Sequence, residues 1–202
     1  MTTPLYVSFE GPEGCGKSTQ ARLLANDIGA VLTRETGGTP IGERLRDILH
    51  DVDVTNLDDR SETLIVAADR AQHIATVVRP ALDAGRHVVS DRSVYSTLAY
   101  QGWGRGLDVD EVRRVNEWAT NGLWPDLVVL LTAPADILDQ RMRDRDLDRF
   151  ERAGDGFHAR VRAGFDAMAA ADPERWIVVD ATGSTDATAA IIRAAITERS
   201  GL

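Results

Sequence analysis

The sequence predicts an α/β domain in which helices cover both faces of a five-stranded parallel sheet. Five apolar runs alternate with stretches of helical periodicity, as expected when each strand is followed by a right-handed crossover helix. Four of the runs are almost wholly apolar, which is typical of parallel strands buried on both faces. The expected strands are residues 5–9, 30–33, 87–90, 127–131 and 176–179. Ligands of such a sheet collect at the carboxyl ends of its strands.

Seven helices are expected from the apolar spacing, at residues 18–28, 40–49, 60–83, 109–121, 134–143, 157–171 and 186–199. In the long stretch 60–83, small and aliphatic side chains recur at helical spacing, as Leu64, Ala67, Ala71 and Ile74 show. This helix is therefore expected to supply core or a dimer face.

Length and composition narrow the class of protein. A chain of 202 residues suits one α/β domain, so a single domain over 1–202 is expected. The net charge of −9 argues against a nucleic-acid polymer or an anionic membrane as partner. One cysteine excludes an intrachain disulfide, the first residues do not resemble a signal peptide, and no apolar run has membrane-spanning length. We expect a soluble, cytoplasmic protein.

A phosphate-binding loop follows the first expected strand. Residues 11–18 read Gly-Pro-Glu-Gly-Cys-Gly-Lys-Ser and fit the pattern G-x-x-x-x-G-K-[ST]. Glycines in such a loop let backbone N–H groups surround a β-phosphate at the positive end of the next helix. Lys17 is expected to reach the β- and γ-phosphates of ATP, and Ser18 to offer its hydroxyl to Mg²⁺. The expected nucleotide-binding residues are Gly11, Pro12, Glu13, Gly14, Cys15, Gly16, Lys17, Ser18 and Thr19.

The alternative for this loop is a glycine-rich turn that binds no nucleotide. Composition opposes that alternative, because Lys17 is the only lysine among the 23 Lys and Arg residues. A compact ammonium is kept at the one place where a point charge must fit between phosphates.

Arginines and glycines follow the second expected strand. Gly37 and Gly38 permit an unusual backbone turn, and Arg34, Arg44 and Arg46 are spaced to hold an anion. Taken alone, this pattern also fits a solvated arginine face.

The third expected strand is closed by Asp91, which is followed by Arg92. An aspartate at this position can hold Mg²⁺ directly or through water. Arg92 can clamp a second phosphate group in a bidentate manner. The next polar side chains lie about one helical turn apart and suit a sugar or a base edge. They are Ser96, Thr97, Tyr100 and Gln101.

Two further segments carry arginine. Asp69 and Arg70 interrupt a stripe of small residues, so Arg70 needs a partner, either across its own helix or in the ligand cleft. Residues 141–152 hold five arginines interleaved with four acids. Such a run is either a solvated helix end with its own ion pairs or a lid that closes on a transferred phosphoryl group and excludes water.

Together these motifs resemble those of the bacterial thymidylate kinases. The resemblance runs in order over about residues 5–180, through 9–14, 33–38, 67–70, 91–102 and 147–151. It implies a P-loop NTPase fold with a short arginine-rich lid at about 141–155, and a homodimer. It also implies Mg²⁺-dependent transfer of the ATP γ-phosphoryl group to dTMP, giving dTDP in dTTP biosynthesis.

The resemblance further implies roles around the acceptor nucleotide. Glu13 would meet the 3′-hydroxyl of the sugar, and Tyr100 would pack under the deoxyribose. The base would be bonded at its carbonyl by Arg70 and read along its edge by Thr97 and Gln101. The groups expected around the monophosphate are Arg34, Arg46 and Arg92.

The resemblance places the catalytic charges in the loop and the lid. Lys17 and Arg92 are expected to act with lid arginines, and Asp91 with Ser18 at the metal. The lid candidates are Arg143, Arg145 and Arg149. Which of the three touches the transferred group is left open, because lid lengths vary.

Three residues depart from the family pattern, and all lie around the acceptor. Val66 stands where a phenylalanine usually stacks on thymine, Thr36 where a proline is usual, and Ser93 where an aromatic residue or histidine is common. Loss of an aromatic stack weakens base binding by roughly 0.5 to 1.5 kcal/mol. A kinase for another pyrimidine nucleotide or a deoxynucleoside is therefore an open alternative, as is a nucleotide-dependent switch.

Overall fold

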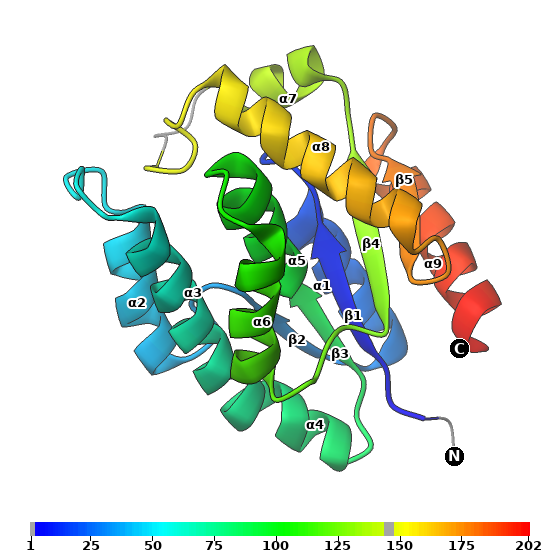
Figure 1. The fold of residues 1–202 in the computed structure, drawn as a ribbon. Helices are drawn as coiled ribbons and strands as arrows, with labels where there is room; N and C mark the ends of the chain where they lie inside the picture. Colours follow the sequence, from blue (N-terminus) through cyan, green and yellow to red (C-terminus); the bar gives the residue numbers. More distant parts are fainter. Residues whose placement is uncertain (1–2, 144–147) are drawn as a thin grey trace.

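The computed structural model describes residues 3–143 and 148–202. Within them, one parallel sheet has the strand order β2-β3-β1-β4-β5 (Figure 1). The strands are β1 (Tyr6–Glu10), β2 (Val31–Arg34), β3 (Val88–Asp91), β4 (Leu127–Thr132) and β5 (Trp176–Asp180). Each overlaps its predicted run, and the predicted α/β fold with five parallel strands is confirmed.

The helices follow the predicted pattern with two differences. The stretch predicted as one helix over 60–83 is divided into α3, a π-helix and α4, and the stretch after Ser93 is helical throughout. The helices are α1 (Lys17–Ile28), α2 (Pro40–His50), α3 (Asp59–His73), η1 (Ile74–Val78), α4 (Arg79–Asp83), α5 (Val94–Thr97), η2 (Leu98–Gly104), α6 (Val109–Thr120), α7 (Ala135–Met142), α8 (Asp155–Ala171) and α9 (Thr185–Ser200), where η marks π-helices.

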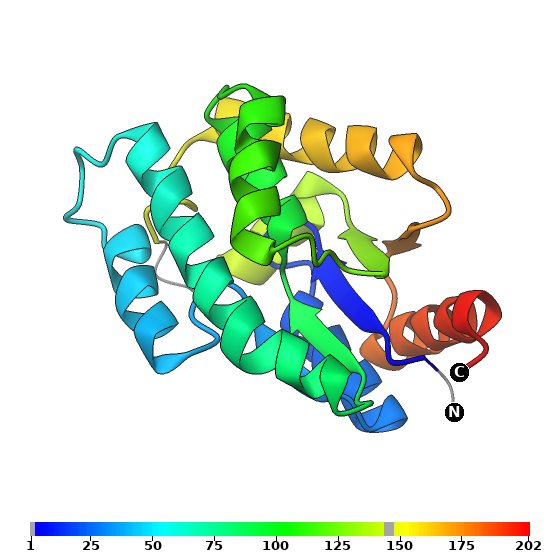
Figure 2. The same ribbon diagram turned by 60° about the horizontal axis from the view of Figure 1, so that its bottom comes forward.

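Alternate strand residues face two different helical layers. Val7 of β1 and Val129 of β4 pack in the core with α1, α7 and α9, whereas Val128 and Leu130 of β4 pack with η2, α6 and α8. Figure 2 shows the sheet with α8 on one side and α9 on the other. The central strands β1, β3 and β4 are thus almost wholly buried on both faces, as their apolar composition predicts, whereas the edge strands β2 and β5 expose Leu32 and Val178.

The centre of the sheet positions the loops that matter for function. β1 and β3 are neighbours, with Phe9 opposite Asp91, and the Arg92 backbone N–H donates to the Phe9 carbonyl at 2.9 Å. The loop after β1 and the residues after β3 therefore leave the sheet side by side at its carboxyl edge, as expected for a ligand site in this architecture.

The turn after β2 depends on its two glycines. Gly37 has a φ of 90°, and its N–H donates to the Asp69 carboxylate of α3 at 3.0 Å. A Cβ at Gly38 would overlap the Arg34 carbonyl oxygen and lie 2.8 Å from Cδ2 of His73. The glycine pair thus lets the turn pack against its own strand and against α3.

The segment predicted as a lid lies only partly within the described residues. Arg145 falls outside them, and the single domain over 1–202 with a lid at about 141–155 stays a prediction. Among the described helices, none is long and apolar enough to cross a membrane.

Gly38→Ala should lower the free energy of unfolding by about 1–3 kcal/mol, because the added methyl group collides with backbone. Gly183→Ala is the matched control, since a Cβ there meets nothing closer than 4.0 Å. Urea unfolding of both variants checks this. An unfolding free energy for Gly38→Ala equal to that of the control would contradict the close packing of the turn.

Candidate active site

The phosphate-binding loop curls tightly between β1 and α1. Gly11, Gly14 and Gly16 have φ values of 134°, 76° and 95°, a region that residues with a Cβ rarely adopt. Lys17 is the first residue of α1, and its Nζ donates to the Pro12 carbonyl at 2.7 Å. The Lys17 side chain is 5% exposed, so the loop holds its ammonium at the helix N-terminus.

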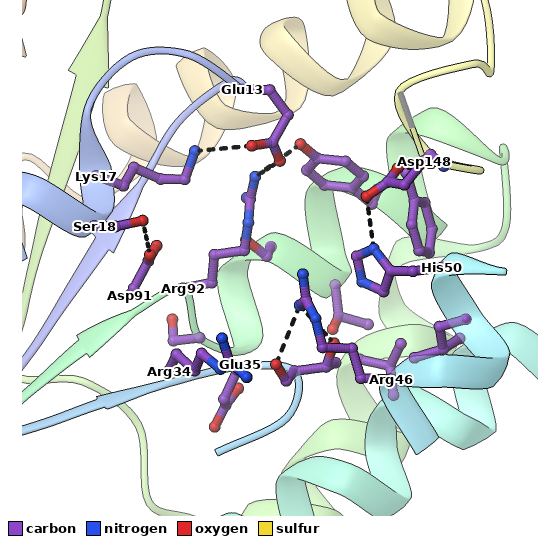
Figure 3. A pocket seen from close by; sticks show the side chains of 18 of the residues that line it. Glu13, Lys17, Ser18, Arg34, Glu35, Arg46, His50, Asp91, Arg92 and Asp148 are labelled. Carbon is purple, nitrogen blue, oxygen red and sulfur yellow. Dashed lines mark hydrogen bonds and ion pairs between the residues drawn. The ribbon is translucent and has the colours of Figure 1, made fainter. Parts of the chain in front are cut away.

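Ser18 and Asp91 form an oxygen pair beside the loop (Figure 3). The Ser18 hydroxyl donates to the Asp91 carboxylate, and both residues line the same cavity. The described residues hold no cluster of three or more His, Cys, Asp or Glu side chains that suits a metal ion. A hydroxyl and a single carboxylate fit Mg²⁺, which keeps several waters and shares its remaining positions with substrate phosphates.

Arg92 bridges the loop and the far side of the cavity. Its backbone is left-handed, with a φ of 71°. Its guanidinium pairs with the Glu13 carboxylate and donates to the Tyr100 hydroxyl at 3.1 Å and to the Ser96 hydroxyl at 2.9 Å. One arginine thus touches both the phosphate loop and the helix after β3.

Glu10 lies behind Arg92 and is fully buried. It accepts hydrogen bonds from the hydroxyls of Ser93 at 2.7 Å and Ser96 at 2.5 Å. Burial raises the pKa of this carboxyl group from 4.5 to about 7, against the opposing effects of Arg92 and the two hydroxyls. The Ser96 hydroxyl donates to Glu10 and accepts from Arg92, so it links the buried carboxyl group to the guanidinium and helps to orient the Arg92 side chain.

A cavity of about 470 Å³ opens in front of these groups. Arg34 and Arg46 line it from β2 and α2, and burial together with the charges of Arg34 and Arg92 lowers the pKa of Arg46. The pocket is therefore electropositive on this side. Deeper, the Thr97 hydroxyl is buried without a hydrogen-bond partner among the described residues.

Arg70 lines the cavity from α3 and is held by a buried network. Its Nε donates to Glu35 at 2.8 Å and its Nη2 to the Ser93 carbonyl at 3.1 Å, while Nη1 donates to the Asn116 side chain. Glu35 also contacts Nδ1 of His73 at 2.7 Å. Of the two alternatives left open by the sequence, the structure favours the cleft: Arg70 lines the cavity, and its partner is Glu35 after β2, not a neighbour on its own helix.

A family model described as thymidylate kinase matches residues 9–192 of this chain, which include the loop, Arg70, Arg92 and the segment after α7. The chain belongs to the thymidylate kinase family. A solved structure agrees in fold: the crystal structure of thymidylate kinase from Ehrlichia chaffeensis superposes with a TM-score of 0.76 at 30% identity, covering 96% of this chain and 97% of that one.

Thymidylate kinases from several bacteria are similar in sequence to this protein over almost its whole length. The protein from Bifidobacterium longum (strain NCC 2705) is 45% identical over 202 residues, covering 96% of this chain and 98% of the relative. The protein from Leuconostoc citreum (strain KM20) is 40% identical over 214 residues, covering 100% of both.

Most residues that the thymidylate kinase pattern assigns to a site lie around the one cavity. The predicted residues that line it are Glu13, Gly14, Gly16, Lys17, Ser18, Thr19, Arg34, Arg46, Val66, Arg70, Asp91, Arg92, Thr97, Tyr100 and Gln101. The roles assigned to them stay predictions. Gly11, Pro12 and Cys15 belong to the loop but not to the described cavity lining.

Two of the three lid arginines of the thymidylate kinase pattern lie within the described residues. Neither Arg143 nor Arg149 is among the described residues lining the cavity. Arg149 donates to Glu62 at 2.6 Å and to the Leu49 carbonyl at 2.8 Å. A catalytic part for either arginine stays a prediction.

Several cavity residues were not named as site residues from the sequence, although Arg141 and Asp148 lie within the predicted lid. Arg141 donates to the carbonyls of Gly14 and Ala181, the latter at 2.9 Å, and so connects α7 to the phosphate loop. His50 contacts Asp148 at 2.6 Å across the cavity mouth (Figure 3). Both pairs join segments far apart in the chain, and no local pattern announces them.

Glu10→Gln should remove a pH dependence of stability. Since the folded-state pKa of Glu10 lies above its ordinary value, the native state binds more protons than the unfolded state between pH 4.5 and about 7. The contribution of Glu10 to the free energy of unfolding is fully present below that window. As pH rises through the window, about 3 kcal/mol of this contribution is lost. Urea unfolding at pH 5 and pH 8 should show this decrease in wild type and not in Glu10→Gln.

The control for this comparison is Glu43→Gln, which removes an exposed carboxyl group of α2. The assignment is wrong if Glu10→Gln loses as much stability between the two pH values as the control does.

Proposed function

We propose that this chain transfers the γ-phosphoryl group of ATP to dTMP, giving ADP and dTDP. One observation carries the proposal: a single cavity is lined by Lys17 and Ser18 of the phosphate loop on one side and by Arg70 and Thr97 on the other. A nucleotide-binding switch needs only the first side. Membership of the thymidylate kinase family supports both halves.

The donor side neutralises and orients the triphosphate. Backbone N–H groups of the loop and the ammonium of Lys17 would bind the β- and γ-phosphate oxygens. Ser18 and Asp91 would hold Mg²⁺, which supplies positive charge to the same oxygens when bound. Arg92 lies within reach of both the loop and Tyr100, so its guanidinium is placed to contact the two reacting ends.

The acceptor side needs to supply no general base. The attacking oxygen belongs to a monophosphate that is already anionic near neutral pH, so in-line displacement depends on positioning and charge. Arg34, Arg46 and Arg92 make the electropositive region that would bind this monophosphate. Glu13 would accept a hydrogen bond from the 3′-hydroxyl of the sugar.

The base would lie between Arg70, Thr97, Gln101 and Val66. Arg70 carries N–H groups for a base carbonyl, and the Thr97 hydroxyl, which has no hydrogen-bond partner within residues 3–143 and 148–202, would bond the base edge. Tyr100 would pack under the deoxyribose. Because Val66 supplies no aromatic face, a kinase for another pyrimidine nucleotide or a deoxynucleoside is the second candidate function.

We also propose that the reaction takes place in the cytoplasm, where ATP and deoxynucleotides are available.

We further propose a homodimer formed through α3. α3 lies between α2 and α6 (Figure 1) and is in contact with both. Its exposed side chains include Ser61, Leu64 and Ala68, with no charge among these three. On the neighbouring helix α6, Trp118 is 84% exposed. A stripe of this composition on a long helix suits a second copy of the chain.

Lys17→Ala should lower kcat for ATP and dTMP at least ~100-fold, because it removes charge stabilisation at the transferred group. Arg193→Ala is the control, since that cation pairs with Asp27 on the far side of α1. ADP release measures the rate, and the melting temperature shows that both variants fold. Substantial residual activity in Lys17→Ala would reject the assignment.

The acceptor is tested in the same assay with dTMP, dUMP, dCMP and thymidine side by side. Under the proposed function dTMP has the highest kcat/KM. Preference for dCMP or for thymidine would replace it with the second candidate.

Leu64→Arg should convert the dimer to a monomer, because an unpaired guanidinium would be buried at the contact. Light scattering coupled to size-exclusion chromatography measures the mass. The matched control is Ile191→Arg on α9, an apolar residue of similar exposure (54% against 58%) on another face. A monomeric wild type, or a Leu64→Arg variant of dimer mass, would contradict the proposed interface.

A further inference from the structure

Glu62 is a fully buried carboxylate that no part of the proposed chemistry uses. It lies on α3, behind the cavity rather than among its described lining residues. Its Oε1 accepts from Nε2 of Gln101 at 2.8 Å and from Arg105 at 3.1 Å. Its Oε2 accepts from Arg105 at 2.9 Å and from Arg149 at 2.6 Å. Two segments distant from α3 in sequence, 101–105 and the one that holds Arg149, thus converge on one side chain.

This carboxyl group is ionised and can only accept hydrogen bonds. Burial alone would raise its pKa, but the hydrogen bonds from Arg105, Gln101 and Arg149, with the charge of Arg105, hold the pKa below its ordinary value. An ionised carboxylate carries no proton to donate.

The acceptor-only character of Glu62 determines which way the Gln101 amide points. The amide nitrogen must face Glu62, because the reversed amide would set its oxygen against a carboxylate oxygen. Gln101 itself lines the cavity. Its oxygen is therefore the end left for the ligand, and a hydrogen-bond acceptor is fixed at the base position.

The neighbours of Gln101 complete a pattern of donors and acceptors. Arg70 offers N–H groups, and the buried hydroxyl of Thr97 can take either part. Thymine and uracil carry a 4-carbonyl that accepts and an N3–H that donates. Cytosine reverses both, with a 4-amino group that donates and an N3 that accepts. The cavity thus matches a 4-oxo pyrimidine and opposes a 4-amino one.

We propose that Glu62 is a positioning residue for base choice: it holds Gln101 with its oxygen toward the base and thereby selects 4-oxo over 4-amino pyrimidine nucleotides. The inference rests on the proposed function. It assigns selectivity to a residue that never touches the substrate, and it makes base choice independent of the aromatic stack that Val66 cannot provide.

The test compares dTMP with 5-methyl-dCMP, which keeps the methyl group and changes only the hydrogen-bonding edge. Wild type should prefer dTMP by about 100-fold or more in kcat/KM, since a buried polar edge that meets the wrong partner is strongly rejected. In Glu62→Gln, the new amide can donate to a reversed Gln101. The preference should then fall at least ~tenfold, with KM rising for dTMP and falling for 5-methyl-dCMP.

Asp59→Asn is the matched control, because Asp59 lies 3.4 Å from Arg105 and shares that partner with Glu62. It removes a carboxylate from the same helix without touching Gln101, so the wild-type preference should remain. General damage to the fold would lower kcat/KM for both nucleotides together and leave the ratio of the two values unchanged. This ratio therefore distinguishes a positioning role of Glu62 from a role in stability.

A second variant, Gln101→Met, provides the test if the Glu62→Gln protein does not fold. Gln101→Met keeps the side-chain length and removes the amide oxygen, and it should lose the same preference. Retention of the wild-type ratio in a folded Glu62→Gln, or in Gln101→Met, would overturn the inference. A wild type that phosphorylates neither nucleotide would instead overturn the proposed function, so the two failures are distinguishable.

Discussion

The acceptor half of this molecule depends on a buried ion pair between Arg70 and Glu35. The two side chains are 2% and 1% exposed, and together they join α3 to the turn after β2, to α5 and to α6. Removing one partner of such a pair leaves an uncompensated buried charge and lowers the free energy of unfolding by about 3–5 kcal/mol. The pair therefore holds this part of the cavity wall in place without a bound nucleotide. The N–H groups of Arg70 that are not used in the network are held in the cavity wall by the same contacts.

The donor half is built in a different way. There the backbone does the positioning: three left-handed glycines shape the loop, and the left-handed Arg92 follows the neighbouring strand. Arg92 contacts both halves, through Glu13 and Tyr100. Its orientation depends in turn on Ser96 and the buried Glu10. Under the proposed function, phosphate binding would depend on main-chain conformation and acceptor binding on a side-chain network, with the Arg92 guanidinium in contact with both.

The sequence was sufficient for the sheet and for the loop, because both leave local signals. Buried parallel strands produce apolar runs, and the loop needs glycines at fixed spacing. The contacts that orient the cavity left weaker signals. Glu10 directly follows an apolar run, and Glu62 precedes Val66 and Arg70 at helical spacing, so both positions could be predicted as buried. Their partners could not, since Ser96 and Gln101 are 86 and 39 residues away. Arg149 was predicted for the lid from motif order, which carries no information on whether its guanidinium meets a phosphate or Glu62.

Lys17 gives the chain an unusual chemical property. As the only lysine in the sequence, it carries the only side-chain amine. Acetylation of a lysine removes its charge, so on this protein that modification has a single possible target, and under the proposed function the charge removed is the one that would meet the nucleotide phosphates. Acylation of lysine side chains is therefore a single event per chain, and the fraction of chains that carry it equals the fraction of phosphate loops that have lost the Lys17 cation.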